Sequence, residues 1–112
     1  MNILFVCTMN KMRSLTAETI YQHDDRFSVK SAGTDETANT KISREIIEWA
    51  DYILVMEKKH RNIIHKLYPN LYANKRIICF YIPDEYQYMD KQLIAILKNK
   101  FEDFWKTEIE KQ

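Results

Sequence analysis

The sequence predicts an α/β fold: one domain over residues 1–112, built as a three-layer sandwich with a four-stranded parallel sheet and helices on both faces. Short runs rich in β-branched and aromatic residues alternate four times with helical stretches. The runs are continuously apolar, which is typical of strands buried on both faces. No linker, internal repeat or low-complexity segment divides the chain, and its 112 residues suffice for one core.

The first half of the chain predicts two strands and two helices. The opening strand stops at Cys7, and Ser14 is the expected N-cap of the helix that follows. A second strand over 26–32 leads into the turn 31–34 and then into a polar stretch. The apolar residues that define the two helices are Leu15, Ala17, Ile20 and Tyr21 in the first, and Ile42, Ile46, Ile47 and Trp49 in the second.

The second half repeats the pattern. Strands are expected over 52–56 and 76–80, with a helix over 58–68 between them that Pro69 and Asn70 close. A loop over 81–89 then leads to Asp90, the expected N-cap of a long helix ending near Glu110. The apolar stripe of that helix consists of Leu93, Leu97, Phe101 and Phe104.

Composition excludes several classes of function. The net charge of +1 argues against dedicated nucleic-acid or membrane-surface binding. Gly33 is the only glycine, which excludes a Walker phosphate loop and a dinucleotide fingerprint. The two cysteines and three histidines have no ligand spacing, so neither a metal nor a cofactor is expected. The N-terminal apolar run is too short for a signal peptide or a membrane span, and we expect a reduced, cytoplasmic protein.

Residues with chemical potential gather where the predicted strands end. Parallel strands share one carboxyl edge, where binding sites of such sheets lie. Cys7, the turn 31–34, the segment 57–61 and the loop 81–90 all follow strands. Scattered residues of the sequence are therefore expected to share one site.

The segment from Cys7 to Arg13 is the strongest candidate for that site. Five residues separate the cysteine from the arginine, and they connect a strand to a helix. A loop of this length can curl around a tetrahedral oxyanion with its backbone N–H groups pointing inward, beside the positive end of the helix dipole. Arg13 adds a planar fork for two phosphate oxygens. The residues expected to bind phosphate are Thr8, Met9, Asn10, Lys11, Met12 and Ser14.

The same positive field favours the thiolate form of Cys7, which is the nucleophilic form. Ser14 can donate a hydrogen bond to that sulfur, both when it attacks and when it leaves. The simpler alternative is that Cys7 is a small buried hydrophobe at the end of a core strand.

Three motifs resemble the low-molecular-weight protein tyrosine phosphatase family. They are Cys7-Thr-Met-Asn-Lys-Met-Arg13-Ser14, Ser31-Ala-Gly-Thr34 and Ile82-Pro83-Asp84-Glu85-Tyr86, and they occur in the family's order. The stretch 50–56 also looks like the family's third strand. The resemblance covers nearly the whole chain.

The resemblance implies a role for each matched residue. Cys7 would be the nucleophile that forms a phosphocysteine, and Arg13 would bind the phosphoryl oxygens. Asn10 would hold the loop in a left-handed turn, which Asn tolerates. Asp84 would protonate the leaving oxygen and then activate the hydrolytic water, which matches the need of this chemistry for an acid and then a base. Tyr86 would be the aromatic residue beside the acid, or it packs in the core.

Departures from the family concern the walls of the site. Met9 stands where a glycine is usual, which the loop tolerates if Met9 keeps a negative φ. Met12 replaces a cysteine that forms a protective disulfide in many members. Glu85 replaces a proline, and the segment between Gly33 and Asp51 is shorter than usual. The expected substrates are therefore phosphotyrosine in a protein or another small phosphomonoester.

Three alternatives remain open at this point. A phosphocysteine carrier would also place a cysteine after the first strand, but it gains nothing from Asp84. An arsenate reductase passes a disulfide through additional cysteines, and this chain has only Cys79 besides Cys7. A non-catalytic phosphate-binding domain would keep the loop without turnover. The run 58–61 is either a solvated helix start or a basic rim for an acidic phosphopeptide, and the sequence leaves the oligomeric state open.

Overall fold

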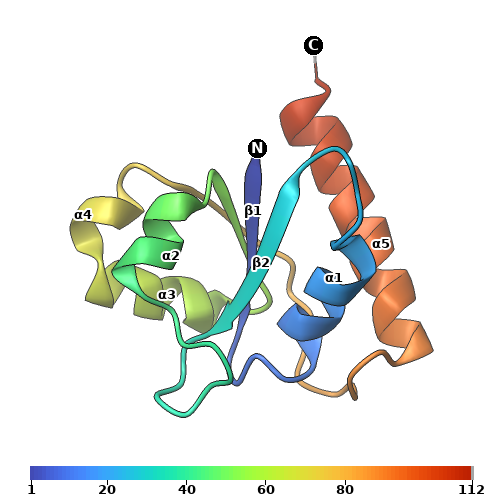
Figure 1. Ribbon diagram of the computed structural model, residues 1–112, viewed down its shortest axis with the longest axis horizontal. Coiled ribbons are helices and arrows are strands. Elements are labelled where there is room, and N and C mark those ends of the chain that lie inside the picture. Colours follow the sequence, from blue (N-terminus) through green and yellow to red (C-terminus); the bar gives the residue numbers. More distant parts are fainter. Residues whose placement is uncertain (112) are drawn as a thin grey trace.

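The computed structural model, which describes residues 1–111, has the predicted α/β architecture (Figure 1). Its four strands are all parallel and lie in the order β2-β1-β3-β4. They are β1 (Asn2–Cys7), β2 (Ser28–Gly33), β3 (Tyr52–Val55) and β4 (Arg76–Cys79). The fold class is confirmed, and the expectation of one domain over 1–112 stays a prediction.

Helices cover both faces of the sheet (Figure 1). One face carries α1 and α5, and the other carries α2, α3 and α4. A π-helical turn over Trp105–Ile109 continues the last helix. The helices are α1 (Arg13–Tyr21), α2 (Arg44–Trp49), α3 (Lys58–Leu67), α4 (Pro69–Tyr72) and α5 (Lys91–Phe104).

Two apolar clusters result, because successive side chains of a strand point to opposite faces. The α5 side is rich in aromatic rings: Phe5 of β1 lies 5.9 Å from Phe101 of α5, measured between ring centroids, and Tyr21 of α1 lies 4.5 Å from Phe101. The opposite side is mainly aliphatic and includes Leu4 and Val6. β1 contributes to both clusters, so its end is held by the core on both sides.

Two local predictions were wrong. Helix α1 begins at Arg13, so Ser14 lies inside it. The Ser14 hydroxyl is bonded to Cys7 and Asn10 and does not cap the helix. Ile42 precedes α2, whose N-cap is Ser43, and the Ile42 N–H donates to Gly33 O at 2.9 Å. Helix α3 ends at Leu67, just before Pro69, as expected; Pro69 also begins the separate short helix α4, which the sequence did not predict and where its missing N–H has no cost. Asp90 caps α5 as expected, accepting from the N–H groups of Gln92 and Leu93.

The two central strands define where a site can form. The connection after β1 runs through α1 on one face, whereas the connection after β3 runs through α3 on the other (Figure 1). The chain therefore diverges at the carboxyl ends of β1 and β3, which is the switch point where parallel sheets bind ligands. Within residues 1–111, no helix is long and apolar enough to cross a bilayer.

Candidate active site

Cys7 is the last residue of β1, and its side chain is 3% exposed. The five residues of loop 8–12 follow it, and Arg13 then opens α1. The Cys7 sulfur lies 2.8 Å from the Ser14 hydroxyl oxygen, as expected for the interaction predicted from the sequence. A cavity of about 180 Å³, here called the loop cavity, lies at this point. It is lined by Cys7, Thr8, Met9, Lys11, Met12, Arg13 and Asp84.

Asn10 and Ser14 lie beneath the loop, outside the lining of the cavity. Asn10 is buried and has a φ of 58°, the left-handed conformation expected from the sequence. Its amide nitrogen donates to the hydroxyls of Ser14 at 2.9 Å and Ser31 at 2.8 Å, and Ser31 donates in turn to Glu18. These bonds fix the turn of the loop against α1 and β2. Met9 has no positive φ, so the side chain at this position is compatible with the loop.

The segment 34–39, here called the strap, covers the outer side of the loop. The carbonyls of Cys7 and Thr8 accept from the backbone N–H groups of Thr34 and Asp35, each at 3.0 Å. Asn39 completes the set, since its backbone N–H donates to Met9 O and its side-chain amide to Asn10 O, each at 3.0 Å. Four successive carbonyls, that of Cys7 and those of the first three loop residues, are therefore bonded to the strap.

The opposite side of the loop backbone is free to bind an anion. The backbone N–H groups of residues 9–12 have no acceptor among residues 1–111. Successive unpaired N–H groups beside a helix N-terminus form an anion-binding nest. The strap donates hydrogen bonds to the backbone carbonyls of residues 7–10. The backbone N–H groups of residues 9–12 therefore remain available to bind a ligand.

Gly33 makes this close contact of strap, strand and loop possible. A Cβ atom at this position would lie 2.4 Å from Thr8 O and 2.6 Å from the Cβ of Ala38. Since real side chains do not approach so closely, glycine is required here for space. Its φ is negative, so left-handed conformational freedom is not the reason.

Arg13 is 2% exposed and reaches across the cavity to two other loops. Its Nη1 donates to Glu57 Oε2 at 2.5 Å and to the carbonyl of Ile82 at 2.7 Å. Its Nη2 has a longer contact of 3.8 Å with Asp84 Oδ1. The guanidinium plane is thus oriented by residues after β3 and β4, and Nη2 is its less constrained end.

Glu57 is a site residue that the sequence placed at the correct edge without giving it a role. Burial raises the pKa of this carboxyl, but the hydrogen bond and the charge of Arg13 outweigh burial and bring the pKa below its usual range. Glu57 is therefore an anion at neutral pH and holds Arg13 in place. The position directly after β3 is the signal that could have found it.

His60 is a second residue that the sequence analysis missed. It is fully buried, although it stands in the charged run 58–61, and its ring connects two loops. Nε2 lies 2.9 Å from the Thr8 hydroxyl oxygen, and Nδ1 accepts from the Glu57 backbone N–H at 3.0 Å. Burial and the Arg13 charge lower the pKa of His60 to about 4, so the ring is neutral at physiological pH.

Asp84 follows Pro83 in the loop after β4, and its side chain is 66% exposed. It lines the loop cavity, near Arg13, where the sequence predicted the acid. Tyr86 is not among the residues that line this cavity; it is half-buried and packs against the aromatic cluster under α5. Of the ten residues predicted for the site, seven line the cavity, and Asn10, Ser14 and Tyr86 do not.

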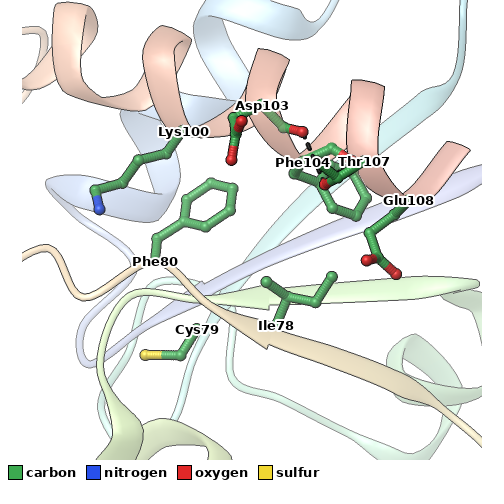
Figure 2. Close-up of a pocket in the computed structure, with 8 residues that line it drawn as sticks. All are labelled: Ile78, Cys79, Phe80, Lys100, Asp103, Phe104, Thr107 and Glu108. Carbon is green, nitrogen blue, oxygen red and sulfur yellow. Dashed lines mark hydrogen bonds between the residues drawn. The ribbon is translucent and has the colours of Figure 1, made fainter. Parts of the chain in front are cut away.

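A larger cavity of about 290 Å³, here called the α5 cavity, lies between β4 and the last helix (Figure 2). Ile78 and Phe80 point toward that helix, whereas Cys79 points to the other side of the strand. The polar residues that line the α5 cavity are Lys100, Asp103, Thr107 and Glu108. None of the residues predicted for the site lies there. Among residues 1–111, no group of three His, Cys, Asp or Glu side chains could hold a metal ion.

The structure thus combines a parallel sheet with a Cys-x5-Arg loop at the end of its first strand. Residues 2–50 match the family model of the low molecular weight phosphotyrosine protein phosphatases. This match confirms the family resemblance recognised in the sequence over residues 2–50. No curated protein matches the sequence at a significant level.

Solved structures support the fold over nearly the whole chain. SP-PTP, a low molecular weight protein tyrosine phosphatase from Streptococcus pyogenes, is similar with a TM-score of 0.79 at 16% identity, over 96% of this chain and 93% of that one. The YwlE arginine phosphatase from Geobacillus stearothermophilus has a TM-score of 0.71 at 19% identity, over 99% and 97%. The tyrosine phosphatase Wzb from Escherichia coli K30, in complex with phosphate, has a TM-score of 0.73 at 20% identity, over 96% and 97%.

Proposed function

We propose that this chain is a cysteine-dependent phosphatase that hydrolyses phosphomonoesters through a phosphocysteine intermediate, with phosphotyrosine in a protein as its first expected substrate. The single observation that carries the proposal is the set of unpaired backbone N–H groups over 9–12, which lie in the loop between the Cys7 thiol and Arg13. A nucleophile placed in an anion-binding nest is suited to attack a phosphoryl group, because the nest stabilises the oxyanion charge that the attack concentrates there.

In the first half-reaction, the Cys7 thiolate attacks phosphorus as the bond between phosphorus and the leaving oxygen breaks. Arg13 and the loop N–H groups bind the three non-bridging oxygens. Asp84 donates its proton to the leaving oxygen, so that an alcohol or phenol departs rather than its anion. The product of this step is phosphocysteine and an ionised Asp84.

In the second half-reaction, water attacks the phosphoryl group and Asp84 takes the proton of that water. The bond between phosphorus and sulfur breaks, and the electron pair returns to sulfur as thiolate, beside the Ser14 hydroxyl at 2.8 Å. Inorganic phosphate leaves, and Asp84 is again protonated for the next cycle.

The arrangement of the cysteines speaks against the arsenate reductase alternative. Cys7 packs with the aromatic cluster on one face of the sheet, whereas Cys79 packs with the aliphatic cluster on the other. A direct disulfide between them would need the sheet to rearrange. Asp84 at the loop cavity speaks against a carrier, because an acid near the phosphoryl group promotes turnover.

The test is turnover of p-nitrophenyl phosphate and of a phosphotyrosine peptide, with acid quenching and mass spectrometry of the protein during the reaction. We expect steady release of phosphate and a transient phosphoryl group on Cys7. A stable phosphoprotein without turnover would instead select the carrier, and phosphate binding without either would select a non-catalytic domain. Parallel assays with phosphoserine and phosphoarginine peptides would define the substrate class.

A further inference from the structure

We infer that His60 is a positioning residue that turns the Thr8 hydroxyl into a hydrogen-bond donor for the phosphoryl group bound in the loop cavity. The inference rests on the proposed phosphate-binding role of loop 8–12, and it adds a side-chain donor to the backbone donors. Neither His60 nor its connection to Thr8 follows from the motifs that identify the site.

The tautomer of His60 follows from its partner at Nδ1. The backbone N–H of Glu57 is directed to this atom at 3.0 Å, and an N–H can only donate. Nδ1 therefore carries a lone pair. Since the buried ring is neutral, its one proton is on Nε2.

The proton on Nε2 determines the role of Thr8. The Nε2–H group donates to the Thr8 hydroxyl oxygen at 2.9 Å, which makes that oxygen an acceptor in this bond. The hydroxyl keeps its own proton, for which residues 1–111 offer no acceptor within hydrogen-bond distance. Thr8 lines the loop cavity, so a bound phosphoryl oxygen is the acceptor within reach of this proton.

The chain of donors has a fixed direction. It runs from the Glu57 backbone through His60 to Thr8 and into the cavity, and each member donates to the next. Because His60 is neutral, this chain adds a donor without adding a second buried cation beside Arg13. The carboxylates of Glu57 and Asp84 and the cations of Arg13 and Lys59 act on the ring, and burial is the largest influence on its pKa.

The first measurement concerns the tautomer and does not depend on catalysis. The ¹⁵N chemical shifts of the His60 ring, recorded on the whole protein at neutral pH, should show a protonated Nε2 and an unprotonated Nδ1. The exposed His65 serves as the reference ring. A proton on Nδ1, or a doubly protonated ring at neutral pH, would overturn the inference.

The second measurement is the affinity for inorganic phosphate, by calorimetry on the wild-type protein and matched variants. Thr8→Val removes the hydroxyl at nearly constant shape, and we expect affinity to fall about 10- to 100-fold, the range for a hydrogen bond to a charged group. Thr8→Ser should restore affinity to within about 3-fold of wild type. Thr107→Val, in the α5 cavity, is the matched control and should bind as wild type does.

His60→Asn separates positioning from folding. The Asn side-chain oxygen can still accept from Glu57 N–H, but the side chain is too short to donate to Thr8. We expect a loss of about 3- to 10-fold in phosphate affinity, smaller than for Thr8→Val because the hydroxyl itself remains. The double variant should bind no worse than Thr8→Val alone, since both changes act through one proton. Additive losses, or wild-type affinity in Thr8→Val, would overturn the inference.

These outcomes are distinct from failure of the proposed function. If the wild-type protein binds phosphate with the expected Thr8 dependence but hydrolyses nothing, the inference stands and the phosphatase proposal falls. If it hydrolyses phosphomonoesters while Thr8→Val binds phosphate unchanged, only the inference falls. A wild-type protein that binds no phosphate would overturn both.

Discussion

The loop cavity and the α5 cavity differ in what surrounds them, and we propose the smaller one as the binding site. The α5 cavity has the larger volume, about 290 Å³ against about 180 Å³, but its polar lining consists of side chains on a helix surface. The loop cavity has unpaired backbone donors, a buried arginine and a cysteine at its base. The difference teaches that prearranged donors define an oxyanion site more reliably than volume does.

The largest expected effect distinguishes the two cysteines. Cys7→Ser should lower phosphatase turnover by about 10⁴-fold or more, because the nucleophile itself is replaced. Cys79→Ala is the matched control: Cys79 is among the residues that line the α5 cavity, its side chain packs on the opposite face of β4, and turnover should stay within about 2-fold of wild type. Steady-state kinetics with p-nitrophenyl phosphate measure both. Equal losses of turnover in the two variants would contradict the assignment of catalysis to the loop cavity.

Asp84→Asn should have the next largest effect. Loss of the general acid is expected to lower kcat by about 10²- to 10⁴-fold, most strongly for substrates whose leaving group is a poor one. Glu85→Gln, the exposed neighbour, is the control and should leave kcat nearly unchanged. The measurement compares kcat for a nitrophenyl ester and an alkyl phosphate. A loss that is the same for both esters would contradict the role of Asp84 as the acid.

His60 should make the stability of the loop region depend on pH. An unfolded histidine has a pKa near 6.5, whereas the pKa of folded His60 is about 4. The unfolded chain therefore binds the proton first as pH falls, and the free energy of unfolding should decline between about pH 6.5 and about pH 4, by about 3 kcal/mol in total. Urea denaturation across this range measures the decline.

His60→Asn should flatten that part of the pH profile, and His65→Asn should leave it unchanged, since His65 is exposed. Lowered pKa values of Asp24, Glu57 and Glu102 add a further loss of stability as pH falls through their own range, below about pH 4.5. An unchanged profile in His60→Asn would show that the ring does not stay neutral in the folded protein.

The smallest expected effect concerns the strap. Asn39→Ala removes one of the four bonds that hold the loop carbonyls, the one to Asn10 O. We expect a loss of about 1 kcal/mol in unfolding free energy and a 2- to 5-fold weaker affinity for phosphate, both on the order of one hydrogen bond. Thr40→Ala, an exposed neighbour, is the control. Unchanged affinity in Asn39→Ala would indicate that the loop keeps its shape without the strap side chain.

The sequence predicted those parts of the fold and site that depend on residues near one another in the chain. Strand runs, the order of elements and the Cys7-to-Arg13 loop are local patterns, and each is present in the structure. Asp84 is remote, but it was recognisable through its motif after Pro83. Their roles in catalysis stay predictions until the variants are measured.

The residues that the sequence did not reveal depend on contacts across long separations. Glu57 meets Arg13 across 44 positions, and His60 meets Thr8 across 52. His60 stands in a run of cations that is typical of a solvated helix start. In the first turn of α3, however, its side chain points into the core and is fully buried. Ser14 was misread as a cap for a local reason: its hydroxyl is bonded to Cys7 and Asn10, which are only seven and four positions away.

Gly33 and the strap have a consequence for how this protein could diversify. The contact at Gly33 leaves no space for a side chain, and Asn39 holds two loop carbonyls, so these two positions are constrained, whereas the exposed residues 36, 37 and 40 have no side-chain bond to the loop backbone. We expect an insertion at residues 36 and 37 to change the surface beside Met9, whose sulfur lies 4.0 Å from the Thr37 hydroxyl oxygen, while the bonds of Asp35 and Asn39 to the loop stay in place. Selectivity and reactivity would then evolve as separable traits on one small scaffold.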